Sequence, residues 1–225
     1  RRRKTVIEQA YNTFNYRKGV LCVEDVPLSD LARRYGTPLY VYSGEKICSQ
    51  FDSFDRAFSE HPHTICYAMK ANGNLGVLNL LARAGAGADI VSGGELFRAL
   101  KAGVPPSRIV FSGVGKTEDE MTAALKAGIL MFNVESAEEM DALARTARRF
   151  GKPAPISIRV NPNVAVDTHH HITTGKAENK FGVMIVQAEA LYRRAAKDPW
   201  LRVTGVQAHI GSQLLDVRPY RETLK

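Results

Sequence analysis

Short apolar runs alternate along this chain with longer segments in which apolar residues recur every three or four positions. The runs are rich in β-branched residues and are bounded by Gly, Pro, Asn or Ser, which predicts buried strands. They lie at residues 64–70 (TICYAMK), 87–92 (GADIVS), 108–113 (RIVFSG), 130–136 (LMFNVES), 155–162 (PISIRVNP) and 203–212 (VTGVQAHIGS).

The periodic segments between these runs predict amphipathic helices, several of which end at a glycine. They cover residues 75–85, 94–103, 118–128, 136–151 and 187–198. The sequence LKAG recurs at 100–103 and 125–128, which would suit a solenoid, but every unit contains an apolar strand and therefore favours a parallel sheet or barrel. The six strands fit a (β/α)8 barrel of about 250 residues without its last two units, and a doubly wound sheet is the alternative.

The first part of the chain does not share this rhythm. Residues 23–43 (VEDVPLSDLARRYGTPLYVYS) predict a helix followed by a strand. We therefore divide the chain into an N-terminal lead-in segment, residues 1–45, and a partial barrel, residues 46–225.

Composition excludes several classes of protein. With 225 residues, 44% apolar and 24% charged, the chain can build a large core and is too apolar to be disordered. The net charge of +8 is spread along the chain apart from residues 1–4, and no basic stripe or aromatic platform accompanies it. We therefore expect no nucleic-acid partner.

The cysteines indicate a reducing compartment. Cys22, Cys48 and Cys66 are odd in number, far apart and without a C-x-x-C pair, which argues against a disulfide framework or a zinc knuckle. No apolar run approaches the roughly 20 residues of a membrane span, and the N-terminus lacks the apolar core of a signal peptide. We expect a soluble, cytoplasmic protein without a membrane partner.

Polar residues stand where the predicted strands end. In (β/α) barrels that end of the sheet carries the active site, because its loops are free to hold functional side chains. Any one of these residues is more often a turn residue than a catalyst, and Lys70 taken alone is better explained as a solvated strand end than as a catalyst. The residues are Lys70, Ser92, Ser112, Asn133, Arg159, Asn161, His209 and Ser212.

Eight short blocks, taken together, resemble the fold-type-III pyridoxal-phosphate-dependent decarboxylases in order and spacing. They are YAMKAN, GADIVSGGEL, FSGVGKT, FNVES, RVNPN, THHHITTG, NKFG and HIGSQ, and they span almost the whole chain. The resemblance implies a barrel of the alanine racemase-like class and pyridoxal 5'-phosphate as cofactor. The histidine-rich loop and HIGSQ are similar to the branch that converts meso-2,6-diaminopimelate to L-lysine and carbon dioxide, rather than to the ornithine or arginine branches.

The resemblance assigns Lys70 as the catalytic residue, which forms a Schiff base with the pyridoxal aldehyde. This chemistry needs an amine that can lose its proton near neutral pH, so we expect partial burial of Lys70 to lower its pKa. Lys70 also argues against a catalytically inactive relative.

Five further residues match cofactor-binding positions of the family. His209 matches the histidine that stacks on the ring, although a buried histidine satisfied by the backbone fits the sequence equally well. Ser212 matches a serine near the phosphate and Arg159 an arginine near the ring. Asp89 and Glu95 match acids around the cofactor, but a strand-start acid and a first-turn helix acid explain them too.

The long segment from residue 163 to residue 182 is a candidate substrate loop. Adjacent histidines in an extended loop point in different directions, so we expect no metal site at residues 169–171. Lys176 and Lys180 could meet a carboxylate of a dicarboxylic substrate or be solvated.

The family also uses parts without a counterpart in these residues. It places a Gly-rich phosphate loop, a glutamate for the pyridinium nitrogen and a C-terminal β-domain further along the polypeptide, and it assembles as a homodimer. We therefore expect weak cofactor retention and negligible turnover from these 225 residues alone. The alternatives are another pyridoxal-phosphate-dependent basic amino-acid decarboxylase, a racemase on the same barrel, or an inactive relative with a binding or regulatory role.

Overall fold

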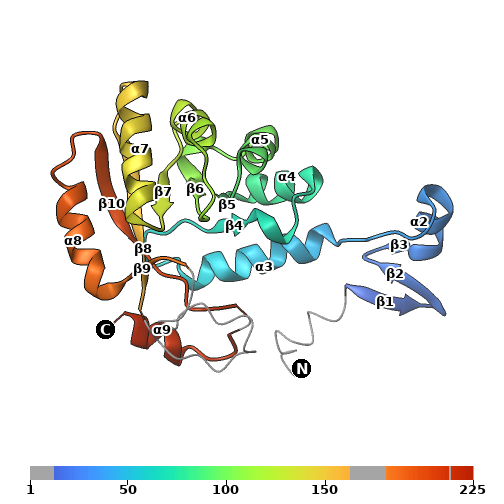
Figure 1. Ribbon diagram of the computed structural model, residues 1–225. Coiled ribbons are helices and arrows are strands. Elements are labelled where there is room, and N and C mark those ends of the chain that lie inside the picture. The colour runs from blue at the N-terminus through green and yellow to red at the C-terminus, as the bar shows by residue number, and fades with distance from the viewer. Residues whose placement is uncertain (1–12, 163–180, 213, 225) are drawn as a thin grey trace.

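The computed structural model describes residues 13–162, 181–212 and 214–224. Figure 1 shows a curved sheet with helices along its outer side and a small separate sheet near the N-terminus. These parts correspond to the two stretches of different hydrophobic rhythm in the sequence.

The small sheet contains a hairpin that the hydrophobic pattern did not predict. Strands β1 (Phe14–Arg17) and β2 (Val20–Val23) pair antiparallel, and β3 (Val26–Pro27) pairs with β2. Lys18 and Gly19 form the two-residue turn with φ values of 48° and 80°, and a turn with both central residues at positive φ matches the twist of the flanking strands.

Half of the prediction for residues 23–43 is confirmed. Helix α2 covers Leu28–Tyr35, as expected. The strand predicted for residues 37–43 is wrong: this segment is an irregular connection to helix α3 (Gly44–Ala57). It has no neighbouring strand among the described residues, and an extended segment needs such a neighbour to form a ladder of hydrogen bonds.

The large sheet confirms the six strands predicted from the apolar runs. Its strands follow the order β10-β8-β7-β6-β5-β4, every pairing is parallel, and the short β9 (Val183–Met184) pairs with β8. Among the described residues, β4 and β10 are its two edges. The strands are β4 (Cys66–Ala68), β5 (Gly87–Ile90), β6 (Ile109–Phe111), β7 (Met131–Val134), β8 (Ala154–Asn161) and β10 (Leu201–Gln207).

Helices follow the strands as predicted. Helix α4 packs against α5, α5 against α6 and α6 against α7, along the outer side of the curved sheet (Figure 1). Three of them end at a glycine in the left-handed conformation, Gly85, Gly128 and Gly151, where a side chain would strain the backbone. The helices are α4 (Leu75–Ala84), α5 (Gly93–Lys101), α6 (Glu118–Ala127), α7 (Ala137–Phe150), α8 (Ile185–Ala195) and the short α9 (Arg218–Thr223).

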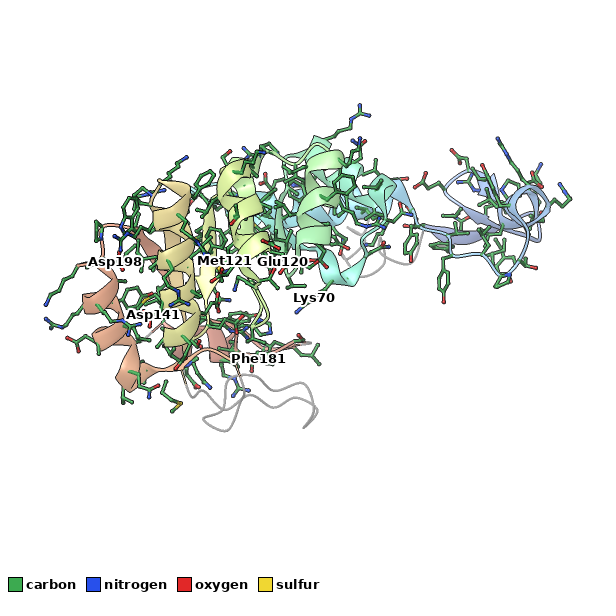
Figure 2. The ribbon with its side chains drawn as sticks, turned by 45° about the horizontal axis from the view of Figure 1, so that its top comes forward. Lys70, Glu120, Met121, Asp141, Phe181 and Asp198 are labelled. Atoms are coloured by element: carbon green, nitrogen blue, oxygen red, sulfur yellow. The ribbon has the colours of Figure 1, made fainter. Side chains whose placement is uncertain are left out.

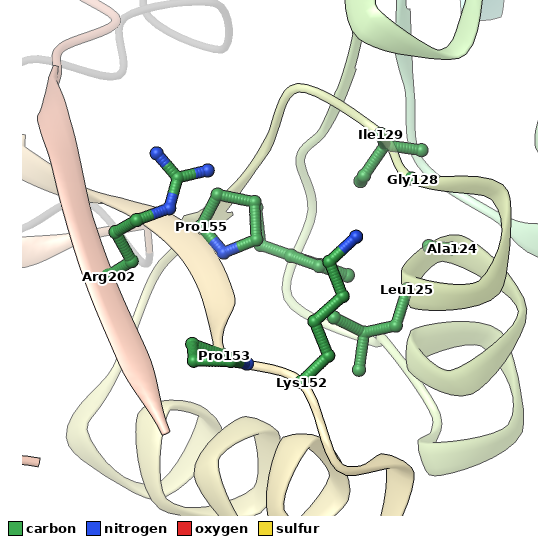
Figure 3. A pocket seen from close by; sticks show the side chains of 9 residues that line it. Ala124, Leu125, Gly128, Ile129, Lys152, Pro153, Pro155 and Arg202 are labelled. Carbon is green, nitrogen blue, oxygen red and sulfur yellow. The ribbon is translucent and has the colours of Figure 1, made fainter. Parts of the chain in front are cut away.

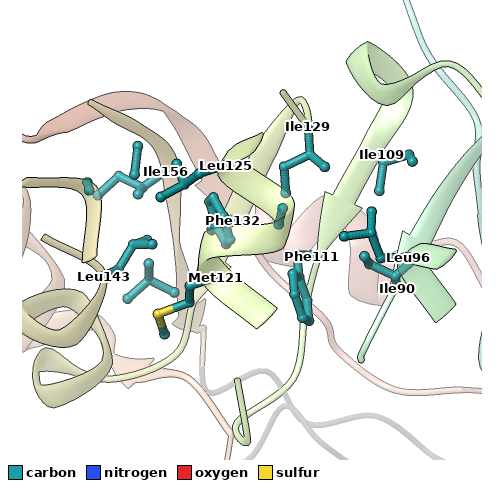
Figure 4. Packing of buried hydrophobic residues seen from close by; sticks show 14 of the residues in the cluster. Ile90, Leu96, Ile109, Phe111, Met121, Leu125, Ile129, Phe132, Leu143 and Ile156 are labelled. Carbon is teal, nitrogen blue, oxygen red and sulfur yellow. The ribbon is translucent and has the colours of Figure 1, made fainter. Parts of the chain in front are cut away.

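The core lies between these helices and the strands, as Figure 4 shows. Phe111 of β6 and Phe132 of β7 are fully buried, with ring centroids 6.0 Å apart. Burying a side chain of this kind contributes about 1.5–3 kcal/mol, so the strands are held firmly from the helix side. The described residues thus form an open, incomplete (β/α) barrel, in agreement with the predicted fold class.

No helix in the part of the chain that the structure describes is long and apolar enough to span a membrane.

Candidate functional site

A row of hydrogen-bonded polar side chains crosses the sheet from β5 to β8. The Ser112 hydroxyl donates a hydrogen bond of 2.6 Å to the Asp89 carboxylate, and the Asn133 amide donates one of 2.9 Å to the Ser112 oxygen. Ser157 in turn donates a bond of 2.5 Å to the Asn133 side-chain oxygen. Asn133 and Ser157 are paired in the register of β7 and β8, so the row follows from the alternation of side chains along adjacent strands.

This row is buried but hydrogen-bonded. Asn133 is 4% exposed and Ser157 is fully buried. Buried polar groups are tolerated when they find partners, and here each side chain supplies the partner of the next. The row therefore fixes the position of Asp89, the member at its β5 end.

Asp89 carries a charge in a mostly buried place. Burial raises the pKa of its carboxyl group, while the Ser112 hydrogen bond and the nearby charges of Lys70, Arg159 and Lys116 lower it. The net shift of the pKa is upward. Asp89 is thus an acid that needs a cationic partner to remain ionised at low cost.

Lys70 lies next to this acid but is more exposed than expected. It belongs to a short 3-10 helix, Met69–Ala71, directly after β4. Its side chain extends away from the helices (Figure 2) and is exposed, which corrects the expected partial burial. The inner side of the barrel is open beside edge strand β4, so no neighbouring element covers the amine in the described residues.

Arg159 projects from β8 and is held on two sides. Its guanidinium donates a hydrogen bond of 3.0 Å to the Glu135 carboxylate and lies 5.3 Å from the centre of the Phe181 ring. The side chain of Arg159 is 12% exposed and that of Glu135 is 1% exposed. Because the pair is shielded from water, its orientation is well defined.

His209 follows β10 and is partly buried. Burial, together with the positive charges of Arg159 and Lys70, lowers its pKa, while Glu135 raises it to a smaller extent. The ordinary pKa of histidine is already below 7, so this imidazole is neutral at neutral pH. Ser212, three residues further on, is exposed.

The other predicted site residues stand apart from this group or outside the description. The Glu95 carboxylate accepts a hydrogen bond of 2.7 Å from the Val91 backbone N–H, and the Ser92 hydroxyl caps the same helix by accepting from the Glu95 N–H. These are contacts of a helix start, so a cofactor role for Glu95 stays a prediction. The histidines 169–171, Lys176 and Lys180 lie outside the described residues.

Three functional candidates were missed from the sequence, namely Lys116, Glu135 and Glu139. All three are largely buried around the end of β7, and Glu135 binds Arg159 directly. One signal was available: Ser136 and Glu139 fit the S/T-x-x-E pattern of a helix start, in which the glutamate turns back to the preceding backbone. The pairing of Glu135 with Arg159 has no comparable signature, since it joins residues of different strands.

Two cavities lie near opposite ends of β8 and β10, and of the predicted site residues only His209 lines one of them. A cavity of about 520 Å³ is lined by His209, Ile210, Gly211, Pro162 and residues of α8 and α9, at the carboxyl ends of β8 and β10. Another, of about 400 Å³, lies at the opposite ends of these strands between Lys152, Pro155 and Arg202 (Figure 3). None of the predicted site residues lines the second cavity. No cluster of three potential metal ligands occurs among the residues that the structure describes.

Comparison with known proteins agrees with this arrangement. Residues 44–225 match the family model described as "Pyridoxal-dependent decarboxylase, pyridoxal binding domain". A diaminopimelate decarboxylase of Pseudomonas aeruginosa is 53% identical over 214 residues, which cover 95% of this chain and 52% of that protein. The chain spans about half the length of the curated relatives it matches.

Solved structures give the same result. The diaminopimelate decarboxylase of Helicobacter pylori complexed with L-lysine matches with a TM-score of 0.85 and 47% identity, covering 87% of this chain and 50% of that one. The corresponding enzyme of M. jannaschii, in co-complex with L-lysine, matches with a TM-score of 0.88 and 38% identity, covering 95% of this chain and 51% of that one.

Proposed function

The chain belongs to the pyridoxal-dependent decarboxylases, and from this premise we propose that it forms the cofactor-binding barrel of an enzyme that converts meso-2,6-diaminopimelate to L-lysine and carbon dioxide. The observation that carries the proposal is the meeting of Lys70, Asp89, Arg159 and His209 at one end of the sheet, in a chain 53% identical to a diaminopimelate decarboxylase.

The side chains present fit pyridoxal phosphate. That cofactor carries an aldehyde, an aromatic ring and a phosphate, and supplies an electron sink for the carbanion left by loss of carbon dioxide. Lys70 offers an exposed amine for the aldehyde, and His209 a neutral imidazole that can lie against a ring without the cost of burying a charge. Asp89 provides an anion and Arg159 a cation: the charge of Lys70 acts on Asp89, and the charge of Arg159 acts on both Asp89 and His209.

In the proposal, Lys70, Asp89 and Arg159 each have a separate role. With the cofactor bound, Lys70 would provide the nucleophilic nitrogen, and its Nζ atom would hold a proton when not bonded to the cofactor. Asp89, held by Ser112, balances the positive charge of Lys70. Arg159, held by Glu135, presents a fixed cation to the anionic cofactor or to a carboxylate.

The substrate assignment rests on relatives. Four curated proteins called diaminopimelate decarboxylase are 52–53% identical to this chain, and three of the matching structures contain L-lysine, the proposed product. In the proposal, Lys176 and Lys180 meet the distal carboxylate of the substrate, Ser212 lies near the cofactor phosphate, and Glu95 lies near the cofactor.

The proposal extends to assembly and location. We infer that the complete protein is a homodimer in the cytoplasm. The location agrees with the free cysteines Cys22, Cys48 and Cys66 of the described residues. Sedimentation of the complete protein would test the dimer: a single species of twice the subunit mass is expected, and a monomer would contradict it.

A substrate assay tests the function. The complete protein, supplied with pyridoxal phosphate, should release carbon dioxide from meso-diaminopimelate and yield L-lysine, with much less release from ornithine, arginine or lysine. Lys70→Ala should abolish the release. If another basic amino acid is turned over faster, that amino acid replaces meso-diaminopimelate as the assigned substrate. If none of them is turned over although the cofactor is bound, the protein is an inactive relative.

A further inference from the structure

Lys116 is a buried cation that the assignments above do not use. It lies between β6 and α6, and its side chain is fully buried. Its ammonium group donates three hydrogen bonds: 2.6 Å to the Gly113 carbonyl, 2.9 Å to the Asn133 carbonyl and 2.7 Å to the Glu139 carboxylate. An ammonium has three hydrogens, so its donor capacity is filled and none is left for a ligand.

Burial of the Lys116–Glu139 ion pair costs free energy of desolvation, which points to a role of the pair other than stabilising the fold. A buried ion pair often contributes no more to stability than apolar residues of the same volume. Burial raises the pKa of Glu139, and the charge of Lys116 is the first of the factors that lower it. The net shift of the Glu139 pKa is upward, and the charge of Lys116 favours the ionised form, so loss of Lys116 would favour a protonated Glu139.

Glu139, which is held by Lys116, in turn holds the backbone of Glu135. The second oxygen of the Glu139 carboxylate accepts a hydrogen bond of 3.0 Å from the Glu135 backbone N–H. The Glu135 carboxylate accepts a bond of 2.8 Å from the Gly113 N–H and one of 3.0 Å from Arg159. Lys116 thus holds the backbone on both sides of this carboxylate, through the Gly113 carbonyl on one side and through Glu139 on the other.

The consequence reaches Arg159. Its guanidinium is oriented by Glu135, which is nearly fully buried and so has little freedom to follow a displaced partner. Lys116 cannot touch a ligand itself because its side chain has no exposed surface. From these contacts we propose that Lys116 is a positioning residue of the cofactor site, which sets the direction of Arg159 through Glu139 and Glu135. This inference rests on the proposed function.

The test measures binding of pyridoxal phosphate to the complete, cofactor-free protein. Lys116→Met leaves Glu139 unpaired, so the matched variant is Lys116→Met combined with Glu139→Gln, which keeps an acceptor for the Glu135 N–H and removes both charges. We expect about ten- to a hundredfold weaker binding of pyridoxal phosphate, the size typical for loss of a group that orients a direct ligand. Lys126→Met, at an exposed lysine of α6, is the control and should bind like the parent.

A double-mutant cycle separates positioning from general loosening. If Lys116 acts through Arg159, the loss of affinity should shrink toward zero when the same pair is introduced into an Arg159→Met protein. An equal loss in both backgrounds would overturn the proposal, as would parental affinity in the neutralised pair. A parent that binds pyridoxal phosphate no better than Lys70→Ala would instead refute the proposed function.

Discussion

Lys70 and Asp89 lie at the ends of two adjacent parallel strands, close enough for the charge of Lys70 to lower the pKa of Asp89. Ala68 of β4 is paired with Asp89 of β5, and Lys70 lies two residues beyond Ala68. The charge of Lys70 lowers the pKa of Asp89, whereas burial, the larger effect, raises it. We therefore interpret the Asp89 carboxylate as the partner of a cation and not as a group that stabilises the fold.

The first prediction concerns Asp89→Asn. The amide keeps an acceptor for the Ser112 hydroxyl but removes a buried charge, so the cofactor-free variant should be more stable than the parent at pH 7. The folded-state pKa of Asp89 lies above its ordinary value of 3.8, so the charge costs stability above the folded-state pKa. The stability gap should narrow as the pH falls through that pKa toward 3.8. Urea unfolding across this range measures it.

Asp52→Asn, at an exposed acid of α3, is the control for this experiment. It should leave the free energy of unfolding within about 0.5 kcal/mol of the parent at each pH. A destabilised Asp89→Asn protein at pH 7 would show that the carboxylate contributes to the fold and would contradict our interpretation.

The second prediction concerns the polar row. Ser157→Ala removes the hydrogen bond to the buried Asn133 oxygen and should cost about 1–3 kcal/mol of stability. Asn133→Ala should cost a similar amount, and the double variant less than the sum, with a coupling of about 0.5–3 kcal/mol. Denaturant unfolding of the four proteins gives this coupling, and strict additivity would mean that the two side chains do not depend on each other.

The third prediction tests the core beneath the site. Phe132→Ala removes a fully buried ring that lies against Phe111 and should cost about 3–5 kcal/mol. Phe97 of α5 is 63% exposed, so Phe97→Ala should cost far less. Thermal or urea unfolding distinguishes the two, and equal losses would contradict the packing described here.

The fourth prediction concerns Cys66. Burial raises the pKa of its thiol from 9.0 to about 11, and the Asp89 charge adds to the increase. The reactive thiolate should therefore be roughly a hundredfold scarcer at pH 8 than in the unfolded chain, since two pKa units correspond to a hundredfold change. Alkylation rates with iodoacetamide, read by peptide mass, should rise accordingly in denaturant. Equally fast reaction of Cys66 in the native protein would contradict this.

Much of the barrel could be predicted because its central strands, β5 to β8, are largely buried. The apolar run RIVFSG at residues 108–113 predicts a central strand, and β6 (Ile109–Phe111) lies there. The N-terminal segment was harder because an apolar, aromatic stretch such as LYVYS at residues 39–43 becomes a strand only when another strand lies beside it. The small hairpin escaped notice since its first strand, Phe14–Arg17, is largely exposed and contains no apolar run.

The site was predictable only where side chains come from strand ends. Arg159 and His209 were expected to converge from their strand ends, and the charge of Arg159 lowers the pKa of His209. Asp89 was matched only through the family resemblance, and the charge of Arg159 lowers its pKa too. Glu135 and Lys116 could not be assigned in the same way, because their partners belong to other strands and helices and no periodicity links them. The exposure of Lys70 likewise depends on what covers the open side of the sheet.

The central claim is that Lys70 carries pyridoxal phosphate, and borohydride trapping tests it most directly. The complete protein is incubated with pyridoxal phosphate, reduced and mapped by peptide mass, with Lys70→Ala and the exposed-lysine variant Lys126→Met as controls. We predict one phosphopyridoxyl group on Lys70, present in Lys126→Met and absent from Lys70→Ala. Label spread over several lysines, or unchanged in Lys70→Ala, would contradict the account.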